Sequence, residues 1–283
     1  MSSATPYLVI GHPLGHSMSP FIHSRLFSLL NIDAAYGMQD IPPEALDTEL
    51  PALFGHIRGV NVTIPHKQAV IPHLTRLEGR AAIYRSVNTV AVTPDGAVGY
   101  NTDADGFLKA LSTADVPLQG RVALLGCGGV ARTFACEAAL AGCRIVNAVR
   151  EADKEAAASL QAFVTELVPD VDYSVVSLDE LDGSFDLLIN ATPVGMYPHV
   201  DASPVSIEVL TSTKAVFDAV YNPRDTKLLQ MAKEVGAVTV GGMAMLVWQA
   251  AVAQEIWLSC RHDPTAVNAV VQEALDEMER MFQ

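Results

Sequence analysis

Polar side chains that can bind a small acid recur in the first hundred residues, each beside an expected strand or helix. Ser17-x-Ser19 precedes a helix, and Asn61-x-Thr63-x-x-x-Lys67 runs along and beyond a strand end. Asn88 and the run Asn101-Thr102-Asp103 add amides and a carboxylate at other strand ends. Taken singly, each group suits a helix cap or a turn. Together, the hydroxyl, amide and ammonium groups suit the binding of a small polyhydroxylated acid.

A glycine-rich turn, Gly126-Cys127-Gly128-Gly129, follows the apolar strand expected at 121–125 and opens an Ala-rich helix. The glycines allow a tight turn and a close approach of the backbone, and the helix N-terminus offers N–H groups to a pyrophosphate. In this strand–turn–helix context the turn predicts nucleotide binding, with a purely structural turn as the alternative.

The end of the next strand indicates which nucleotide is bound. An NAD site typically carries an acidic residue about 20 positions after the first glycine, whereas an arginine there suits a 2′-phosphate. Arg150 stands at about that distance from Gly126, and Lys154 follows one turn later. Glu151 and Asp153 lie among them, so the pocket is not cleanly basic. The pattern favours NADP and leaves NAD open.

The elements that must position these groups are of two kinds. The first hundred residues mix strands with a helix: strands at 7–10 and 58–64, a helix at 20–30, and hairpin strands at 89–93 and 97–100 around Pro94-Asp95-Gly96. The chain then alternates strands and helices, with strands expected at 121–125, 145–149, 185–189, 215–220 and 237–240. Such alternation predicts a parallel sheet with helices on both faces.

Two helices are expected after Gly241-Gly242. The first, over 243–259, is apolar on most faces, and the second, over 264–281, is amphipathic. A very apolar helix at the end of a nucleotide domain usually packs against another part of the protein, so we expect it to return to the first domain.

Length and composition limit the function classes. The chain has 283 residues, which suggests about two domains, and 50% of them are hydrophobic. Its formal charge of −14 disfavours nucleic acid and membrane surfaces as partners. The four cysteines form no C-x-x-C pair, the histidines show no metal-ligand spacing, and residues 1–6 lack the features of a signal peptide. We therefore expect a soluble cytoplasmic protein with reduced thiols and no metal.

Several ordered motifs resemble the shikimate dehydrogenase family. They are Gly11-His-Pro-Leu-Gly-His-Ser17-Met-Ser19-Pro20, Asn61-Val-Thr63-Ile-Pro-His-Lys67, Val87-Asn88-Thr89, Asn101-Thr-Asp103, Gly126-Cys-Gly-Gly129, Asn190-Ala-Thr-Pro-Val-Gly-Met196, Tyr221-Asn222-Pro223 and Met245-Leu-Val-Trp-Gln249-Ala250. They follow the family's order from near residue 7 to about residue 259, which makes a chance match untenable.

The resemblance implies an α/β protein of two domains. An N-terminal α/β catalytic domain (1–104 and 242–283) would surround a Rossmann dinucleotide-binding domain (105–241) with a doubly wound parallel sheet. It also implies an oxidoreductase that reversibly reduces 3-dehydroshikimate to shikimate with NADPH, in the chorismate pathway to aromatic amino acids.

The resemblance assigns roles to individual residues. Lys67 and Asp103 would form the catalytic pair, and Ser17 and Ser19 would hold the substrate carboxylate with help from Tyr221. The remaining assignments are ring-hydroxyl contacts by Asn61, Thr63, Asn88 and Gln249, and cofactor contacts by Gly126, Gly128, Gly129, Arg150, Lys154, Asn190, Thr192 and Gly242. A lysine ammonium suits the developing alkoxide of a reduced ketone, but the sequence does not settle which of Lys67 and Asp103 carries the proton.

Two positions bear on specificity. The family commonly reads Asn-Arg-Thr-x-x-Arg after the second Rossmann strand, where this chain reads Val149-Arg150-Glu151-Ala152-Asp153-Lys154. Lysine lacks the bidentate geometry of arginine and Glu151 repels a 2′-phosphate, so we expect a weakened NADP preference with NAD usable. Relatives that use quinate often carry Ser-x-Thr where this chain has Ser17-x-Ser19, which favours shikimate.

Alternatives remain at this point. A quinate or quinate/shikimate dehydrogenase that uses NAD is one, and a non-catalytic sensor of shikimate-like ligands is another. The intact Lys67 and Asp103 argue against a sensor. The sequence does not distinguish a monomer from a homodimer.

Overall fold

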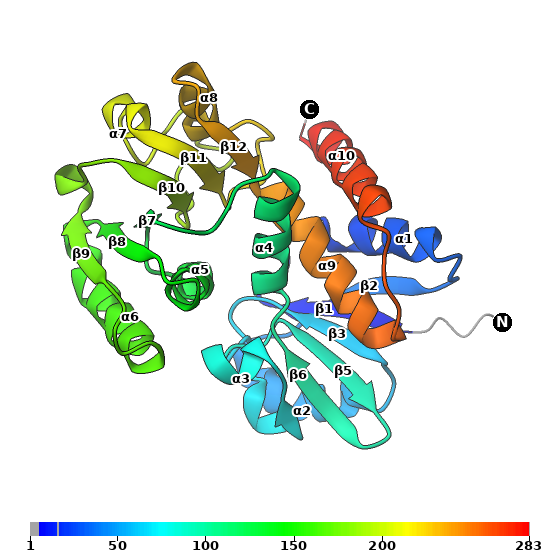
Figure 1. The fold of residues 1–283 in the computed structure, drawn as a ribbon. Helices are drawn as coiled ribbons and strands as arrows, with labels where there is room; N and C mark the ends of the chain where they lie inside the picture. The colour runs from blue at the N-terminus through cyan, green and yellow to red at the C-terminus, as the bar shows by residue number, and fades with distance from the viewer. Residues whose placement is uncertain (1–5, 16, 283) are drawn as a thin grey trace. The chain divides into compact units, whose positions relative to one another are not determined.

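The structure, a computed structural model, describes residues 6–15 and 17–282. The chain divides into two compact units (Figure 1). The first comprises residues 1–106 and 247–278, and the second comprises 107–246 and 279–283. The predicted catalytic domain comprises residues 1–104 and 242–283, whereas residues 242–246 and the end of the chain from residue 279 group with the second unit. The division into catalytic and nucleotide-binding domains stays a prediction.

A mixed six-stranded sheet forms the centre of the first unit. Its strand order is β2-β1-β3-β5-β6-β4. The strands are β1 (Pro6–Gly11), β2 (Ala35–Asp40), β3 (Gly59–Val62), β4 (Arg76–Leu77), β5 (Thr89–Thr93) and β6 (Gly96–Tyr100). Strand β1 runs parallel to β2 and β3, whereas β5 is antiparallel to both β3 and β6. The carboxyl ends of β1, β3 and β6 and the start of β5 therefore meet at one edge of the sheet.

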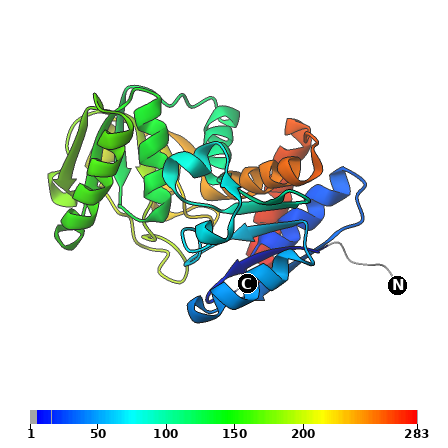
Figure 2. The ribbon, with the colours of Figure 1, turned by 90° about the horizontal axis from the view of Figure 1, so that it is seen from below.

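Helices cover both faces of this sheet. In Figures 1 and 2, α1 (Ser19–Leu29), α9 (Gly242–Leu258) and α10 (Pro264–Met281) lie on one face and α2 (Leu46–Phe54) lies on the other. The indole of Trp257, on α9, donates a hydrogen bond of 3.0 Å to the carbonyl of Val90 and stacks on Tyr7. The end of the chain thus packs against strands formed by its beginning, and the apolar character of α9 follows from this burial. The short helix α3 (Arg80–Tyr84) precedes β5.

The second unit contains a fully parallel six-stranded sheet, of order β12-β11-β10-β7-β8-β9. Its strands are β7 (Arg121–Leu125), β8 (Arg144–Val149), β9 (Tyr173–Ser177), β10 (Phe185–Asn190), β11 (Thr213–Asp218) and β12 (Val238–Gly241). The helices are α5 (Gly129–Leu140), α6 (Lys154–Leu167), α7 (Ile207–Thr211) and α8 (Lys227–Glu234), together with most of α4 (Asp103–Thr113). This is the doubly wound Rossmann order, and it confirms the predicted parallel sheet.

The strand order of the second sheet reverses between β7 and β10. Ligands of such folds bind at this switch point, outside the carboxyl ends of the strands. The turn at 126–129 follows β7, and Asn190 ends β10. On one side of the sheet the rings of Phe107, Phe134 and Phe217 contact one another at centroid distances of 4.5–5.4 Å and form part of the core.

Candidate active site

Lys67 and Asp103 form an ion pair at the polar edge of the first sheet. The Nζ of Lys67 lies 2.6 Å from Oδ2 of Asp103, and their side chains are 28% and 13% exposed. Lys67 follows β3 in a run of turns, and Asp103 is the first residue of α4, directly after β6. The two predicted catalytic residues, 36 positions apart in sequence, are therefore brought into contact.

The second oxygen of Asp103 is held by Asn88. The Nδ2 of Asn88 donates to Oδ1 of Asp103 at 2.8 Å and to the hydroxyl of Thr102 at 3.1 Å. Its Oδ1 accepts hydrogen bonds from the backbone N–H of Thr102 at 2.7 Å and the hydroxyl of Thr89 at 3.1 Å. Both amide hydrogens and both lone pairs are thus used within the protein. In this structure Asn88 orients the carboxylate of the ion pair.

The network continues from Asn88 to two other predicted substrate-binding residues. Oε1 of Gln249, on α9, lies 3.4 Å from Nδ2 of Asn88. The Nδ2 of Asn61 donates to the carbonyl of Asn88 at 3.2 Å and to Oγ1 of Thr89 at 3.0 Å. Asn61, Asn88 and Gln249 are all buried, so their amides are fixed by these contacts.

Ser17, Ser19 and Thr63 lie at the same edge, at the carboxyl ends of β1 and β3. The backbone N–H of Ser19, which begins α1, donates to the hydroxyl of Ser17 at 3.2 Å. Thr63 packs so closely on Gly11 that a Cβ at Gly11 would lie 2.5 Å from the Thr63 methyl group. Glycine at position 11 is therefore required for the close approach of the segments that carry these side chains.

Tyr221 belongs to the second unit, in the segment that follows β11. Burial raises the pKa of its phenol above the ordinary value, so the group is neutral at physiological pH. Its role in binding the substrate carboxylate stays a prediction.

The glycine-rich turn of the second unit has the geometry of a phosphate loop. Gly126 adopts φ +95°, and Gly128 is the N-cap of α5. A Cβ at Gly126 would lie 2.9 Å from the Thr192 methyl group, whereas a Cβ at Gly128 or Gly129 would meet no described atom within 4 Å. The N-terminus of α5 thus faces open space at the switch point, which fits the pyrophosphate of a dinucleotide.

Buried polar residues shape this turn and its neighbour. Asn147, on β8, donates to the carbonyls of Leu124 and Gly126 at 2.9 and 2.8 Å. Asn190 donates to Asp218 at 2.9 Å, and its own oxygen accepts from the backbone and hydroxyl of Thr192. Asn190 is fully buried, so it shapes the 190–194 turn.

Gly242, the first residue of α9, is explained by backbone packing. A Cβ at this position would lie 2.4 Å from the carbonyl oxygen of Ala219. Its N–H is bonded to the carbonyl of Val220 at 3.3 Å. Only glycine allows this approach, and a contact of Gly242 with the cofactor stays a prediction.

The two predicted phosphate-binding cations are both paired with neighbouring acids. Arg150 Nε lies 2.6 Å from Asp153, and Lys154 Nζ lies 2.7 Å from Glu151. The hydroxyl of Ser177 also donates to Glu151 at 3.2 Å. The side chains of Arg150 and Glu151 are largely exposed and those of Asp153 and Lys154 are partly exposed, so a 2′-phosphate can compete with the carboxylates for both cations.

Cys127 lies within the turn, where a helix N-terminus can activate a thiol. Burial raises its pKa instead, assisted by the carboxylate of Asp153. Cys127 therefore has the character of a small structural residue in a tight turn, not of an activated thiol. Among the described residues, no group of three or more His, Cys, Asp or Glu side chains could hold a metal ion, and no helix is long and apolar enough to cross a membrane. His16 lies outside the described residues.

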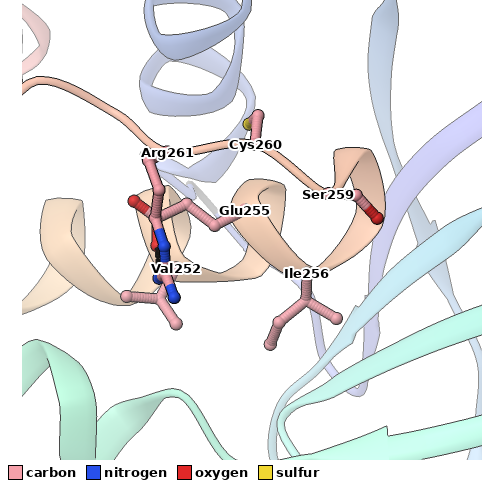
Figure 3. Close-up of a pocket in the computed structure, with 6 residues that line it drawn as sticks. All are labelled: Val252, Glu255, Ile256, Ser259, Cys260 and Arg261. Carbon is pink, nitrogen blue, oxygen red and sulfur yellow. Dashed lines mark hydrogen bonds and ion pairs between the residues drawn. The ribbon is translucent and has the colours of Figure 1, made fainter.

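A surface cavity of about 520 Å³ lies elsewhere, at the C-terminal end of α9 (Figure 3). Val252 and Ile256 point from the same side of the helix, Arg261 lies beside Glu255, and Cys260 points away. None of the lining residues is a predicted site residue. The cavity is therefore not assigned to the active site.

The sequence analysis assigned no role to several residues that hold the site together. Tyr36 and Thr89 bind the amide of Asn61 in the first unit. In the second unit Asn147 donates to the glycine-rich turn, and Asp218 accepts from Asn190 and from the hydroxyl of Thr226. Asn147 and Asp218 were visible as polar residues within or at the end of apolar strands. The repeated Asn-Thr pair at 88–89 and 101–102 was a signal for the hairpin network. Tyr36 gave no local signal.

Comparison with known proteins identifies similar chains. The family described as "Shikimate dehydrogenase substrate binding domain" matches residues 9–90. A Bacillus thuringiensis subsp. konkukian (strain 97-27) protein, named Shikimate dehydrogenase (NADP(+)), is 40% identical over 258 residues, covering 90% of this chain and 92% of that protein.

Two solved structures are similar over nearly the whole chain. Shikimate 5-dehydrogenase from Thermus thermophilus, in complex with NADP(H) and shikimate, is 33% identical with a TM-score of 0.84, covering 96% of this chain and 100% of the other. Shikimate 5-dehydrogenase from Listeria monocytogenes, in complex with shikimate and NAD, is 27% identical with a TM-score of 0.86, covering 96% and 97%.

Proposed function

The chain belongs to the shikimate dehydrogenase family, and from this premise we propose that it catalyses the reversible, NADP-dependent reduction of 3-dehydroshikimate to shikimate, a step towards chorismate and the aromatic amino acids. The observation that carries the proposal is the Lys67–Asp103 ion pair, fastened by Asn88 among buried amides and hydroxyls. The names of the Bacillus protein and the Thermus complex support the cofactor and the substrate.

Lys67 supplies the proton donor for the ketone oxygen. When bound, the nicotinamide cofactor supplies the hydride, and negative charge then develops on that oxygen. An ammonium has three N–H groups, and one of those of Lys67 is directed at Asp103 at 2.6 Å. The other two make no hydrogen bond to the described residues and can donate to the developing alkoxide, which is the interaction that lowers the barrier.

Asp103 orients Lys67 and completes the pair through which the proton passes. Its Oδ2 binds Lys67, and its Oδ1 is anchored by Asn88. With both oxygens fixed, the carboxylate holds the ammonium in one position. A group held this way is pre-positioned for the reaction, which contributes to the rate without any new contact.

The binding roles that we propose are those that the resemblance to the family implies. We assign the substrate carboxylate to Ser17 and Ser19, assisted by Tyr221, and the ring hydroxyls to Asn61, Thr63 and Gln249. Asn88 acts on the substrate mainly through Asp103, because its own hydrogen-bonding capacity is used. The pyrophosphate is assigned to Gly126, Gly128 and Gly129, and the 2′-phosphate to Arg150 and Lys154, with Asn190, Thr192 and Gly242 shaping the adjacent surface.

The proposal is tested by a matrix of activities on the purified protein. NADP⁺ and NAD⁺ are each combined with shikimate and quinate, and we expect the highest kcat/KM with NADP⁺ and shikimate. A higher value with quinate or NAD⁺ selects the corresponding alternative. Absence of turnover in all four combinations refutes the proposed enzymatic activity and favours a ligand sensor.

The first mutational prediction concerns Lys67. Lys67→Ala should lower kcat by about 100- to 10,000-fold, the range for loss of a general acid, while shikimate binding measured by calorimetry persists. Lys214→Ala is the matched control, because Lys214 is also ion-paired, at 2.8 Å from Asp186, but lies in the second unit. A Lys67→Ala variant with the kcat of the control contradicts the assignment.

Cellular location and assembly are also proposals. We expect the cytoplasm, which agrees with four cysteines that are all free thiols. A monomer or a homodimer is expected, and light scattering of the purified protein decides between them.

A further inference from the structure

The phenol of Tyr36 reaches across a strand to contact Asn61. Tyr36 lies on β2 and Asn61 on β3, and β1 separates these strands in the sheet. Two strand spacings amount to about 9–10 Å, a distance that the long tyrosine side chain spans. Its hydroxyl lies 2.7 Å from Oδ1 of Asn61. The contact joins the edge strand directly to a residue assigned to the substrate.

This contact fixes the orientation of the Asn61 amide. Both hydrogens of its Nδ2 are directed into the protein, to the carbonyl of Asn88 and to Oγ1 of Thr89. Its Oδ1 accepts from Tyr36 with one lone pair. Among the described residues, no hydrogen bond occupies the second lone pair of Oδ1, because the Nε2 of the neighbouring His23 has no hydrogen-bond partner. Asn61 can therefore only accept a hydrogen bond from a ligand.

The tyrosine donates its hydroxyl hydrogen to Asn61 in this arrangement. Burial raises the pKa of the Tyr36 phenol well above its ordinary value, and a hydrogen bond with Ser19 only partly offsets the rise. The phenol is therefore neutral, and its hydrogen is directed to the amide oxygen. Tyr36 thus contacts two residues assigned to the substrate, Ser19 and Asn61.

A buried histidine holds the ring of Tyr36 in place. The imidazole of His23, on α1, stacks on it with centroids 4.0 Å apart and planes within 6°. His23 is fully buried, and Gln254 of α9 donates to its carbonyl at 2.9 Å and lies 3.1 Å from its Nδ1. Burial lowers the pKa of His23 to about 3, against an opposing effect of the Asn61 amide. The imidazole of His23 is therefore neutral, and its flat face packs against the ring of Tyr36.

We propose that Tyr36 is a positioning residue for substrate binding: it locks the Asn61 amide so that only an oxygen acceptor faces the ligand, and the site thereby selects a ring hydroxyl that donates. The inference rests on the proposed function, because it takes the ring-hydroxyl role of Asn61 from there. Tyr36 itself acts through Asn61.

The test begins with Tyr36→Phe, which removes the hydroxyl and keeps the ring that stacks on His23. The KM for shikimate should rise about tenfold, with kcat within about twofold and the KM for NADP⁺ unchanged. Tyr7→Phe is the matched control, since Tyr7 is the register partner of Tyr36 across β1 and β2 and is buried, with no hydrogen bond from its hydroxyl to the described residues. A general effect of losing a buried hydroxyl would appear in both variants.

A double-mutant cycle shows whether the effect passes through Asn61. Tyr36→Phe should change nothing further in an Asn61→Ala background. If the effects of the two substitutions on KM multiply, Tyr36 contacts the substrate independently of Asn61, and the proposal is overturned. If Tyr36→Phe does not fold, Thr89→Val releases the other end of the same amide and should raise the same KM. An unchanged KM for Thr89→Val then counts against the proposal.

Wild-type turnover separates this inference from the proposed function. If the wild type does not oxidise shikimate, both fail. If it does, and Tyr36→Phe behaves as Tyr7→Phe, only the positioning role of Tyr36 is refuted.

Discussion

Replacing Asn88 with alanine separates two roles that this residue could have in the reaction. A residue that only binds substrate raises KM when it is removed, whereas a residue that positions the catalytic pair lowers kcat. Asn88 donates to Oδ1 of Asp103 at 2.8 Å and accepts from the backbone N–H of Thr102 at 2.7 Å. Because all its hydrogen-bonding capacity is used inside the protein, we expect Asn88→Ala to act mainly on kcat.

The expected magnitudes follow from these contacts. Loss of the hydrogen bond to the carboxylate costs about 1.5–3 kcal/mol, and the orphaned N–H of Thr102 costs about 1–3 kcal/mol. The free energy of unfolding should therefore fall by about 2.5–6 kcal/mol. A catalytic group displaced by about 1 Å can lose about 100-fold in rate. We expect kcat to fall by about 30- to 100-fold, with the KM for shikimate within about threefold.

The assay combines steady-state kinetics with urea unfolding. Asn101→Ala is the matched control, because Asn101 is equally buried but binds the backbone N–H of Asp103, at 3.2 Å, rather than its carboxylate. It should lose stability, by about 0.5–2 kcal/mol for a lost cap, and retain most of kcat. A rise in KM at constant kcat for Asn88→Ala would refute the positioning role and restore Asn88 as a direct substrate contact.

Two further predictions concern cofactor choice and acid stability. Glu151→Ser removes the carboxylate that lies 2.7 Å from Lys154, so the kcat/KM ratio of NADP⁺ over NAD⁺ should rise by about three- to tenfold, whereas Glu155→Ser, on α6 next to Lys154, should leave it unchanged. His23 has its pKa lowered to about 3 by burial, so the unfolded chain binds a proton below about pH 6.5 that the folded chain does not. The free energy of unfolding should then fall by about 1.4 kcal/mol between pH 7.5 and pH 5.5, in addition to any fall measured for a His23→Asn variant. An equal pH dependence in the two proteins would contradict the conclusion that His23 is buried and neutral.

The nucleotide unit was largely predictable because its signals are local. A strand, a glycine turn and a helix follow one another directly, so Gly126, Gly128 and Gly129 could be placed from spacing alone. Their neighbours Asn190 and Thr192 come from a strand that is distant in sequence but adjacent in the sheet. Arg150 pairs with Asp153, three residues after it, and Lys154 pairs with Glu151, three residues before it, so these contacts are local as well.

The substrate unit was less predictable because its site depends on the order of the strands. Strand β2 is an edge strand whose residues are exposed or half-buried, so no apolar alternation marks it. Helix α2 contains Pro51, which argues against a helix in a sequence taken alone. The position of Tyr36 opposite Tyr7 becomes visible only when β2 pairs with β1. The contact between Tyr36 and Asn61 therefore required the register of three strands.

The pairing of the cations bears on how a chain with a formal charge of −14 binds anions. Lys67, Arg150 and Lys154 each lie within 2.7 Å of a carboxylate, so none of these pairs presents net positive charge before a ligand arrives. Under the proposed assignments, the attraction of a carboxylate or phosphate rests on neutral donors, namely the hydroxyls of Ser17 and Ser19 and the N-terminus of α5. Acidic groups farther than about 8 Å are largely screened at physiological salt. Specificity in such a site comes from the directions of hydrogen bonds, which is why the buried amides that set those directions matter as much as the cations.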